Sequence, residues 1–418
     1  MESPLRIISI SNFFYFTFSL SELKLELFKG KFKDVKDEAA KEDEAMIPLD
    51  YIYNYEEHVF CDYQKTADQA GLVYINEKEK EKIAQGVKWL LTKIGGNILK
   101  GQSIMNVSLP VFLFDPRSMH EVFCYELRGA PYYLTKAYYS PDEFERIKWI
   151  VVYLVSQLYI TTLQLKPFNP IIGETFQCKV GNLNLYTEHT SNHPNIAHFY
   201  GFDDDKLYKI YGYMEVTATT GPNSVTAMKK GKYVIEFKDG DKYEIHIPFL
   251  EIRGTTLNPR IFAYLQSGAV INTGKDIGCL LEFNPDKVGY FKSWFTSKQV
   301  SVPDSFVGVV TKASNIKISP KDCYHKIIEA HKDEYATVKG EWAKEIIFDG
   351  EDKYWDIKEN ALLPIYKIGF QLPSDGRNRP DLQALFKGDL ETSQKEKEKL
   401  EVLQRADRKL RAANAKKK

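Results

Sequence analysis

Lys397, Glu401 and Arg405 are three charged residues near the C-terminus whose spacing suggests that they act together. They follow one another at intervals of four, so on a helix they lie along one face. Arg405 could hold a phosphate group through two parallel hydrogen bonds. A solvent-exposed row of salt bridges has the same spacing and contributes only about 0.3 kcal/mol per pair. The spacing alone therefore fits both a phosphate site and a solvated helix face.

Lys166 is a second candidate for phosphate binding, and Asn169 follows it closely. A lysine ammonium binds phosphate strongly where the site is partly desolvated, and the amide of Asn169 could donate to the same group. The alternatives are a solvated surface lysine and an asparagine that forms a turn before Pro170.

Three histidines, His189, His193 and His198, lie close together in the sequence. The imidazole of His193 could donate to a phosphate, although a histidine beside a proline can equally be a core residue. Asn192 can donate through its amide but never carries a charge. We expect no metal site, because no cysteine or carboxylate stands at ligand spacing and this segment should be extended rather than helical.

Sequence patterns typical of catalysis and of nucleic-acid binding are absent. No G-x-G-x-x-G, Walker, G-x-S-x-G or H-E-x-x-H motif occurs. Lys plus Arg total 57 and Asp plus Glu total 57, so the formal net charge is zero and the basic excess of a nucleic-acid binder is missing. We therefore expect a protein that is not an enzyme and that needs no cofactor.

The candidate residues flank and interrupt a region with strand-like patterns. After Lys166, apolar and polar residues alternate in successive runs, and Gly181-Asn182 and Asp239-Gly240 are turn signals between neighbouring runs. The predicted strands cover 174–180, 183–190, 196–202, 207–216, 233–237, 243–247, 277–283 and 305–312. Many antiparallel strands in succession predict a meander that curls into a barrel.

Helices are expected on both sides of this region. Residues 77–100 have apolar side chains at helical spacing, and 388–418 form a charge-rich segment of helical character. Ser140 is the predicted N-cap of a further helix, with Pro141 at N1 and Glu143 in capping-box position. The apolar run 147–165 fits a buried helix, although its Val, Tyr and Ile content also suits a strand.

The N-terminal segment Ile7–Leu20 is apolar and aromatic and follows Arg6. Glu2 and the lack of a small-residue cleavage site argue against a signal peptide, and the segment is short for a membrane-spanning helix. A lid, a membrane anchor and a signal stay open as interpretations. The charged stretch that follows, up to residue 44, is typical of a linker.

Two segments resemble motifs of the oxysterol-binding-protein-related family of lipid-transfer proteins. Residues 166–176 read KPFNPIIGETF, similar to the family's K-P-x-N-P-x-x-G-E-x-F. Residues 188–195 read EHTSNHPN and match the family's E-Q-V-S-H-H-P-P at four positions, among them His193. Weaker similarities occur within 109–119, 372–381 and 388–405. Together they span most of the chain in the family's order.

The resemblance implies an α+β, mainly β fold. This is a large incomplete antiparallel β-barrel that encloses a lipid tunnel, with N-terminal helices, a lid and a helical C-terminal subdomain. Residues 1–44 would then be the lid and linker, and 45–418 the lipid-binding domain. Within that domain, the resemblance implies a helical part over 45–165, the barrel over 166–312 and a C-terminal helical part over 313–418.

The resemblance also implies a site for a lipid head group. Its residues would be Lys166, Pro167, Phe168, Asn169, Asn192, His193, Lys397, Glu401 and Arg405. Asn192 stands where the family has the first histidine of its pair, which would weaken phosphoinositide binding by about 1–2 kcal/mol. Gln157 resembles a family glutamine that meets a sterol hydroxyl in the tunnel, and a core glutamine with protein partners is the alternative.

The resemblance implies an intracellular lipid carrier, cytoplasmic and peripheral at membranes. Its cargo would be a sterol or a phospholipid such as phosphatidylserine, exchanged for phosphatidylinositol 4-phosphate. The expected partners are this lipid cargo and anionic membranes, touched transiently by a monomer, with no nucleic acid. Residues 391–418 hold ten Lys/Arg against five Asp/Glu, so the C-terminal helix is the expected membrane contact. A lipid sensor or membrane-contact scaffold that does not transfer lipid is the alternative.

Overall fold

The computed structural model describes most of the chain after residue 108. The described residues are 63–65, 72–74, 81, 84–86, 89, 108–162, 165–220, 224–254, 261–265, 267–285, 304–316, 333–359, 363–368 and 371–415. The segment Ile7–Leu20 and the linker after it lie outside them, as does most of the predicted helix at 77–100, of which residues 81, 84–86 and 89 are helical.

In the described range 108–162, three α-helices precede the long strands of the sheet: α5 (Met119–Glu126), α6 (Ala130–Tyr138) and α7 (Glu143–Ser156). The second half of α7 is buried on all sides, from Ile150 to Ser156, which explains its continuous apolar sequence. The prediction of a buried helix rather than a strand is therefore confirmed for this part. The helix ends earlier than expected, and the chain continues as the short 3₁₀ helix η5 (Leu158–Thr161).

The start of α7 differs from the prediction. Asp142 is the N-cap, because its side chain accepts a hydrogen bond from the backbone N–H of Glu145 at 2.8 Å. The hydroxyl of Ser140 instead donates to the backbone carbonyl of Lys136, which closes the end of α6. The prediction of Ser140 as the N-cap is therefore wrong, because the helix is capped two residues later.

Eighteen of the described strands belong to one sheet. Four long strands pair antiparallel in sequence order, namely β5 (Thr175–Val180), β6 (Leu183–Asn192), β7 (Asn195–Asp203) and β8 (Tyr208–Thr220). On the side away from β6, strand β5 pairs with β20 (Ile365–Lys367).

The sheet forks at β8. The first half of β8 pairs with β10 (Tyr233–Phe237), and the second half pairs with β9 (Ser224–Lys230). Gly212 and Gly231 lie at the fork with φ of 156° and 136°, and a Cβ on Gly212 would come within 1.8 Å of the Lys232 carbonyl oxygen. Two glycines therefore let the backbones approach closely where the sheet divides.

Each arm of the fork continues as a series of antiparallel strands. One arm runs from β10 through β11 (Lys242–His246), β14 (Ser267–Asn272), β15 (Gly278–Phe283), β16 (Ser305–Thr311), β17 (Ala336–Glu341) and β18 (Glu345–Phe348) to β19 (Asp352–Asp356). The other runs from β9 through β12 (Phe249–Arg253), β13 (Ile261–Leu265) and β2 (Leu72–Tyr74) to β1 (Tyr63–Lys65). No pairing among the described strands joins β20 to β19 or to β1, so the sheet is an incomplete barrel, as predicted.

The division of the chain into helical and barrel parts differs from the expectation. Residues 313–418 were expected to be helical, but strands β17 to β20 occupy much of 336–367, and α10 (Pro380–Phe386) and α11 (Leu390–Ala415) follow. In β17 the buried Ala336 and Val338 alternate with the exposed Thr337 and Lys339, which is a strand pattern over only a few residues. The expected helical part over 45–165 likewise contains strands, including β3 (Phe114–Ser118).

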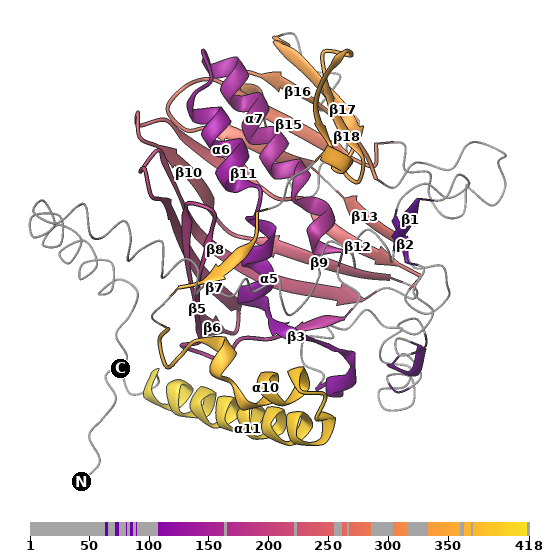
Figure 1. Cartoon of the computed structure of the whole chain (residues 1–418), viewed down its shortest axis with the longest axis vertical. Coiled ribbons are helices and arrows are strands. Elements are labelled where there is room, and N and C mark those ends of the chain that lie inside the picture. Colours follow the sequence, from indigo (N-terminus) through magenta and orange to yellow (C-terminus); the bar gives the residue numbers. More distant parts are fainter. Residues whose placement is uncertain are drawn as a thin grey trace, which may run out of the picture.

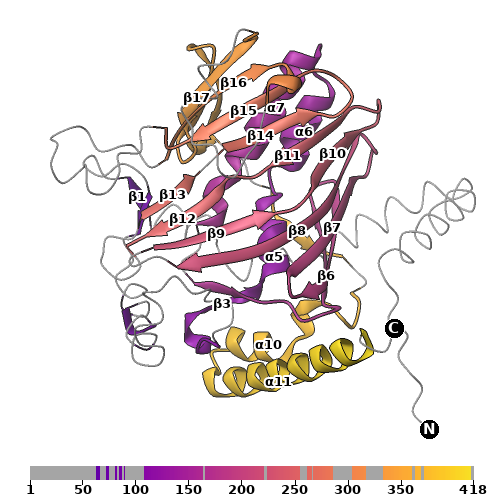
Figure 2. The ribbon, with the colours of Figure 1, turned by 180° about the vertical axis from the view of Figure 1, so that it is seen from behind.

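The helices cover one face and one end of the sheet. Helices α5, α6 and α7 lie in front of the sheet in Figure 1 and behind it in Figure 2, so they pack on the same face. Helices α10 and α11 lie across one end of the molecule, below β3 in both views. None of the helices among the described residues has the length and the apolar composition needed to cross a bilayer.

Candidate functional site

A pocket of about 670 Å3 lies between α11 and the nearby ends of the barrel strands. We call it the mouth pocket. Of the nine residues predicted for the head-group site, all except Pro167 line it: Lys166, Phe168, Asn169, Asn192, His193, Lys397, Glu401 and Arg405. The fold therefore brings together residues more than 200 positions apart in the chain.

Lys166 enters the pocket from a short parallel pair of strands. Strand β4 (Lys166–Phe168) pairs with β3, and this register places Lys166 opposite Phe114. The Phe114 ring lies 5.3 Å from the ammonium of Lys166 and 5.4 Å from that of Lys397, so one aromatic face attracts two cations. Burial, with the positive charge of Lys397 next, lowers the pKa of Lys166 to about 8, and Glu401 acts in the opposite direction.

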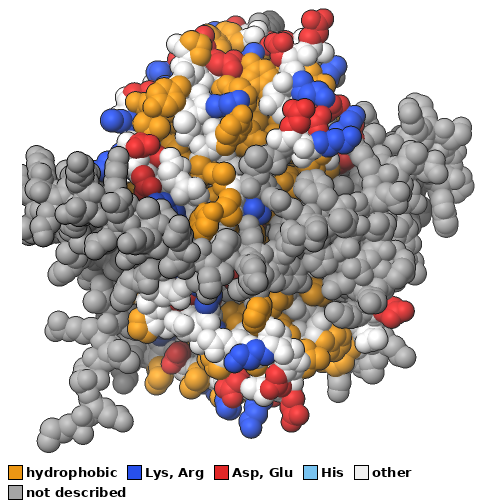
Figure 3. All heavy atoms as spheres, viewed as in Figure 1, with side chains coloured by type: hydrophobic (Ala, Val, Ile, Leu, Met, Phe, Trp, Pro, Cys, Tyr) orange, Lys and Arg blue, Asp and Glu red, His pale blue; other side chains and the backbone are white. Residues whose placement is uncertain are grey.

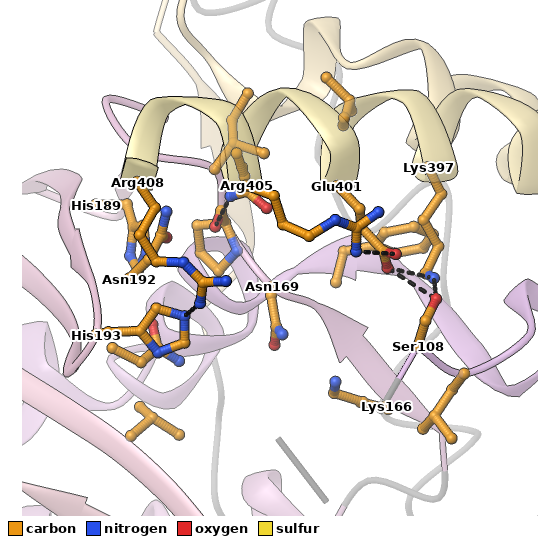
Figure 4. Close-up of a pocket in the computed structure, with 18 of the residues that line it drawn as sticks. Ser108, Lys166, Asn169, His189, Asn192, His193, Lys397, Glu401, Arg405 and Arg408 are labelled. Atoms are coloured by element: carbon orange, nitrogen blue, oxygen red, sulfur yellow. Dashed lines mark hydrogen bonds and ion pairs between the residues drawn. The ribbon is translucent and has the colours of Figure 1, made fainter. Parts of the chain in front are cut away.

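The three residues that follow Lys166 differ in whether their side chains face the mouth pocket. Pro167 is buried and faces a second cavity, described below, instead of the mouth pocket. Phe168 is buried and packs on Phe114 with 4.7 Å between ring centroids. The side chain of Asn169 points into the mouth pocket (Figure 4), while its carbonyl accepts a hydrogen bond from Arg379 at 2.8 Å. Of these three, Asn169 is the one that presents a polar side chain to the mouth pocket.

The turn between β6 and β7 carries Asn192 and His193. The Oδ1 atom of Asn192 lies 2.7 Å from Nε2 of His189. Burial lowers the pKa of His189 to about 4, so this imidazole is neutral and its one N–H is on Nε2, facing the Asn192 oxygen. The oxygen of Asn192 is thereby held by the protein, and its amide N–H groups are left to donate toward the pocket.

His193 has a partner that the sequence patterns did not indicate. The Nε2 atom of His193 lies 2.9 Å from NH1 of Arg408, and Figure 4 shows the two side chains pointing toward each other across the pocket. Arginine can only donate, so Nε2 of His193 accepts and the ring proton lies on Nδ1. In this state the histidine orients Arg408, and the cation that the pair presents to the mouth pocket is the arginine.

The predicted charged trio on α11 is unevenly placed. Lys397 is 5% exposed and donates to Ser108 Oγ at 2.9 Å and to Glu401 Oε1 at 2.7 Å. The side chain of Arg405 is 56% exposed, and its NH1 atom lies 3.8 Å from Glu401. Lys397 and Glu401 therefore form a fixed pair, whereas Arg405 lies at the rim.

Helix geometry explains why Arg408 reaches the pocket. Each residue turns an α-helix by about 100°, so Arg405 is rotated by about 80° from Lys397 and Arg408 by only about 20°. Residues at intervals of four, such as Lys397, Glu401 and Arg405, therefore move gradually away from the helix face that carries Lys397. An interval of eleven from Lys397 would have found Arg408.

Arg379 is another residue of the mouth pocket that was not predicted as a site residue. Its guanidinium makes ion pairs with Glu174 at 2.9 Å and with Asp381 at 2.6 Å, and all three side chains are nearly fully buried. The contacts bind the segment after β4 to the start of α10. Its role is structural, because its donors are used within the protein.

A second cavity of about 360 Å3 adjoins the mouth pocket on the barrel side. We call it the inner cavity. Its lining is mainly apolar and comes from α5, α7, β8, β9 and β12. The two cavities share part of their lining, so the polar mouth opens onto the apolar interior; the shared residues are Leu109, Lys166, Asn169, Val216 and Thr217.

Gln157 lines the inner cavity, but the protein already engages its amide. Its Oε1 atom accepts from the backbone N–H of Gly129 at 3.3 Å, and its Nε2 atom donates to Ser156 Oγ at 2.8 Å. These contacts fit the alternative of a core glutamine with protein partners.

Over the described ranges, no cluster of three or more His, Cys, Asp or Glu side chains could hold a metal ion. In the histidine-bearing turn at residues 189–198, one ring nitrogen of each histidine is engaged: His189 with Asn192, His193 with Arg408 and His198 with Thr190.

The sequence profile described as Oxysterol-binding protein matches residues 96–418. The chain belongs to the oxysterol-binding protein family. Oxysterol-binding protein 9 of Dictyostelium discoideum is 32% identical over 342 residues, which are 81% of this chain and 78% of that protein. Human oxysterol-binding protein-related protein 8 is 25% identical over 309 residues, which are 68% of this chain but only 31% of the human protein. This chain therefore spans less than a third of that longer relative.

Solved structures of the oxysterol-binding protein family share the fold. The Osh3 ORD from Saccharomyces cerevisiae, in complex with PI(4)P, superimposes with a TM-score of 0.60 at 20% identity, over 87% of this chain and 88% of that one. The Osh1 ORD domain in complex with ergosterol gives a TM-score of 0.60 at 18% identity, over 81% and 90%. These comparisons confirm the predicted family and the predicted incomplete barrel. The family consists of lipid-binding proteins and not of enzymes, which confirms that prediction as well.

Proposed function

We propose that this oxysterol-binding protein family member transfers lipid between membranes, with the hydrocarbon body in the inner cavity and the polar head in the mouth pocket. The observation that carries the proposal is that the two cavities adjoin and share lining residues, Lys166 and Asn169 among them. An amphiphile needs such an arrangement, with an apolar space that opens directly onto polar donors. The neighbours of the same fold hold PI(4)P in one case and ergosterol in another.

Burial of the lipid body supplies the driving force for loading. Removing about 400 Å2 of apolar surface from water at ~25 cal/mol per Å2 contributes on the order of 10 kcal/mol before the entropy of binding is subtracted. This gain depends little on the head group, so the mouth pocket has to provide the discrimination between head groups.

The mouth pocket suits a phosphorylated head group. Lys166, Lys397, Arg405 and Arg408 line it, and only Glu401 supplies a carboxylate among the described side chains of its lining. The amide of Asn192 adds a neutral donor beside these cations. We therefore propose PI(4)P as one of two exchanged lipids and a sterol or phosphatidylserine as the other.

The experiment is a liposome exchange assay. Donor liposomes carry a fluorescent sterol or labelled phosphatidylserine, and acceptor liposomes carry 5% PI(4)P or none. We expect the protein to move the labelled lipid and to move it faster when the acceptors contain PI(4)P. No transfer of any of the three lipids would overturn the proposal, and lipid binding without transfer would favour a sensor or scaffold.

We further propose that α11 docks this carrier on anionic membranes. Val402, Leu403 and Leu410 are 57%, 61% and 64% exposed, and residues 402–418 hold seven Lys/Arg against one Asp. Figure 3 shows hydrophobic and charged side chains together along the lower edge of the molecule, where Figure 1 places α10 and α11. Apolar side chains among cations on a helix suit the interface of an anionic bilayer.

Substitution of Leu403 and Leu410 by serine should weaken binding to phosphatidylserine vesicles, measured by sedimentation, about 30-fold, because each leucine contributes about 1 kcal/mol when partly inserted. Tyr139→Ser is the matched control, since Tyr139 is 69% exposed and is the C-cap of α6, and Figure 1 shows α6 far from α11. Equal loss in the control, or no loss in the double variant, would contradict the docking proposal.

A further inference from the structure

The inner cavity contains an ion pair in a wall that is otherwise mainly apolar. Glu126, the last residue of α5, accepts a hydrogen bond from the ammonium of Lys229 on β9, and both residues line the cavity. Glu126 is only 7% exposed. Burial raises its pKa, and the charge of Lys229 opposes that shift. A charged pair at this position is not needed to hold a hydrocarbon body.

Two hydroxyl groups belong to the same polar spot. The hydroxyls of Tyr153 on α7 and Tyr233 on β10 are hydrogen-bonded to each other, and both tyrosines line the cavity. Burial above all raises the pKa of both phenols, and the nearby negative charge of Glu126 adds to the shift. Four elements of the fold therefore bring Glu126, Lys229 and two phenols to one part of the inner cavity.

The free-energy cost of desolvating the Glu126–Lys229 pair depends on which ligand fills the cavity. A hydrocarbon chain placed against it would remove the last water from two charges and return no hydrogen bond, which is unfavourable. An alcohol can donate to the carboxylate of Glu126 and accept from the ammonium of Lys229, so it replaces the water it displaces. A ligand with an alcohol at this point therefore keeps both charges satisfied.

We propose that the Glu126–Lys229 pair selects cargo whose buried body carries a hydroxyl group and rejects cargo whose buried body is hydrocarbon alone. The inference rests on the proposed lipid-carrying function and narrows its substrate class. It assigns the selection to the ion pair instead of Gln157, whose amide has protein partners. Lipids with two plain acyl chains in the inner cavity are the disfavoured class.

The test uses two ligands that differ by one hydroxyl. Cholesterol and cholest-5-ene, which lacks the hydroxyl, compete for the protein against a fluorescent sterol. For the wild-type protein we expect cholesterol to compete at least about 10-fold better, the factor that one hydrogen bond to a charged group supplies. In Glu126→Leu/Lys229→Met the preference should fall to within about 2-fold, with cholest-5-ene binding more tightly than to the wild type.

Folding of the double variant is checked by thermal unfolding, and replacement of a buried ion pair by apolar residues of similar size is expected to be tolerated. Lys230→Met is the matched control, because Lys230 neighbours Lys229 on β9 but is exposed, and it should keep the wild-type preference. An unchanged preference in the double variant, or none in the wild type, overturns the inference. It is also overturned, with the carrier function intact, if the protein loads phospholipid but no sterol. Failure to load any lipid would instead defeat the proposed function itself.

Discussion

Arg379→Met should lower the free energy of unfolding by about 3–5 kcal/mol, the largest stability loss that we expect from a single polar substitution in this protein. Its guanidinium pairs with Glu174 and Asp381, whose side chains are 1% and 0% exposed. Methionine keeps much of the volume but leaves two carboxylates buried without their cation. The result would be measured by urea unfolding followed through tryptophan fluorescence.

Arg405→Met is the matched control for this substitution. Arg405 also lies on the mouth pocket and near a carboxylate, but its side chain is 56% exposed and 3.8 Å from Glu401. We expect a change below about 0.5 kcal/mol, as for other solvent-screened pairs. A similar loss of stability in both variants would show that the contribution of Arg379 to the free energy of unfolding does not depend on the burial of its ion pairs.

Lys166→Met should weaken binding of PI(4)P about 10- to 100-fold, because a hydrogen bond to a charged group contributes about 1.5–3 kcal/mol in a partly desolvated site. Sterol loading should change far less, since the stem of methionine can cover the same apolar surface. The comparison requires equilibrium binding of both lipids to each variant. Equal loss for sterol and PI(4)P would contradict the head-group role.

The lowered pKa of Lys166 also predicts a dependence on pH. Its pKa of about 8 means that the free protein holds a charged lysine below pH 8 and loses it as the pH rises further. Phosphate binding favours the charged form, so PI(4)P affinity should fall between pH 7.5 and 9, where the lipid's own phosphate charge is almost constant. Lys166→Arg, which stays charged, should remove this dependence, and a flat profile for the wild type would refute it.

The sequence predicted some strands of the barrel well and missed others for a physical reason. Strands β6 and β7 alternate buried with less buried residues along most of their length, and β5 to β8 match the predicted strands, although β8 continues to Thr220. Strands β9 and β12 were not predicted, and nearly all of their residues are half-buried on both faces. These two strands line the inner cavity, so neither face is a solid core and the period-2 pattern is lost.

The residues of the candidate site were also only partly predictable from the sequence. The motif residues led to Lys166, His193 and Lys397, because their types and order match the family motifs in the sequence. The Glu126–Lys229 pair was invisible there, since 103 residues separate its members and neither stands in a recognisable pattern. Pairing of this kind depends on how α5 packs against β9, which only the fold determines.

The fork at β8 assigns the wall of the cavity and the packing of the core to different sets of strands. The arm through β9 and β12 supplies much of the inner-cavity wall, including Lys229, whereas the arm through β14 to β18 is largely buried in the core. Substitutions in the first arm can change what the cavity accepts at little expense to the packing of the second. The fold is in this sense modular for evolution: cargo preference can diverge between descendants while the scaffold that keeps them folded is inherited unchanged.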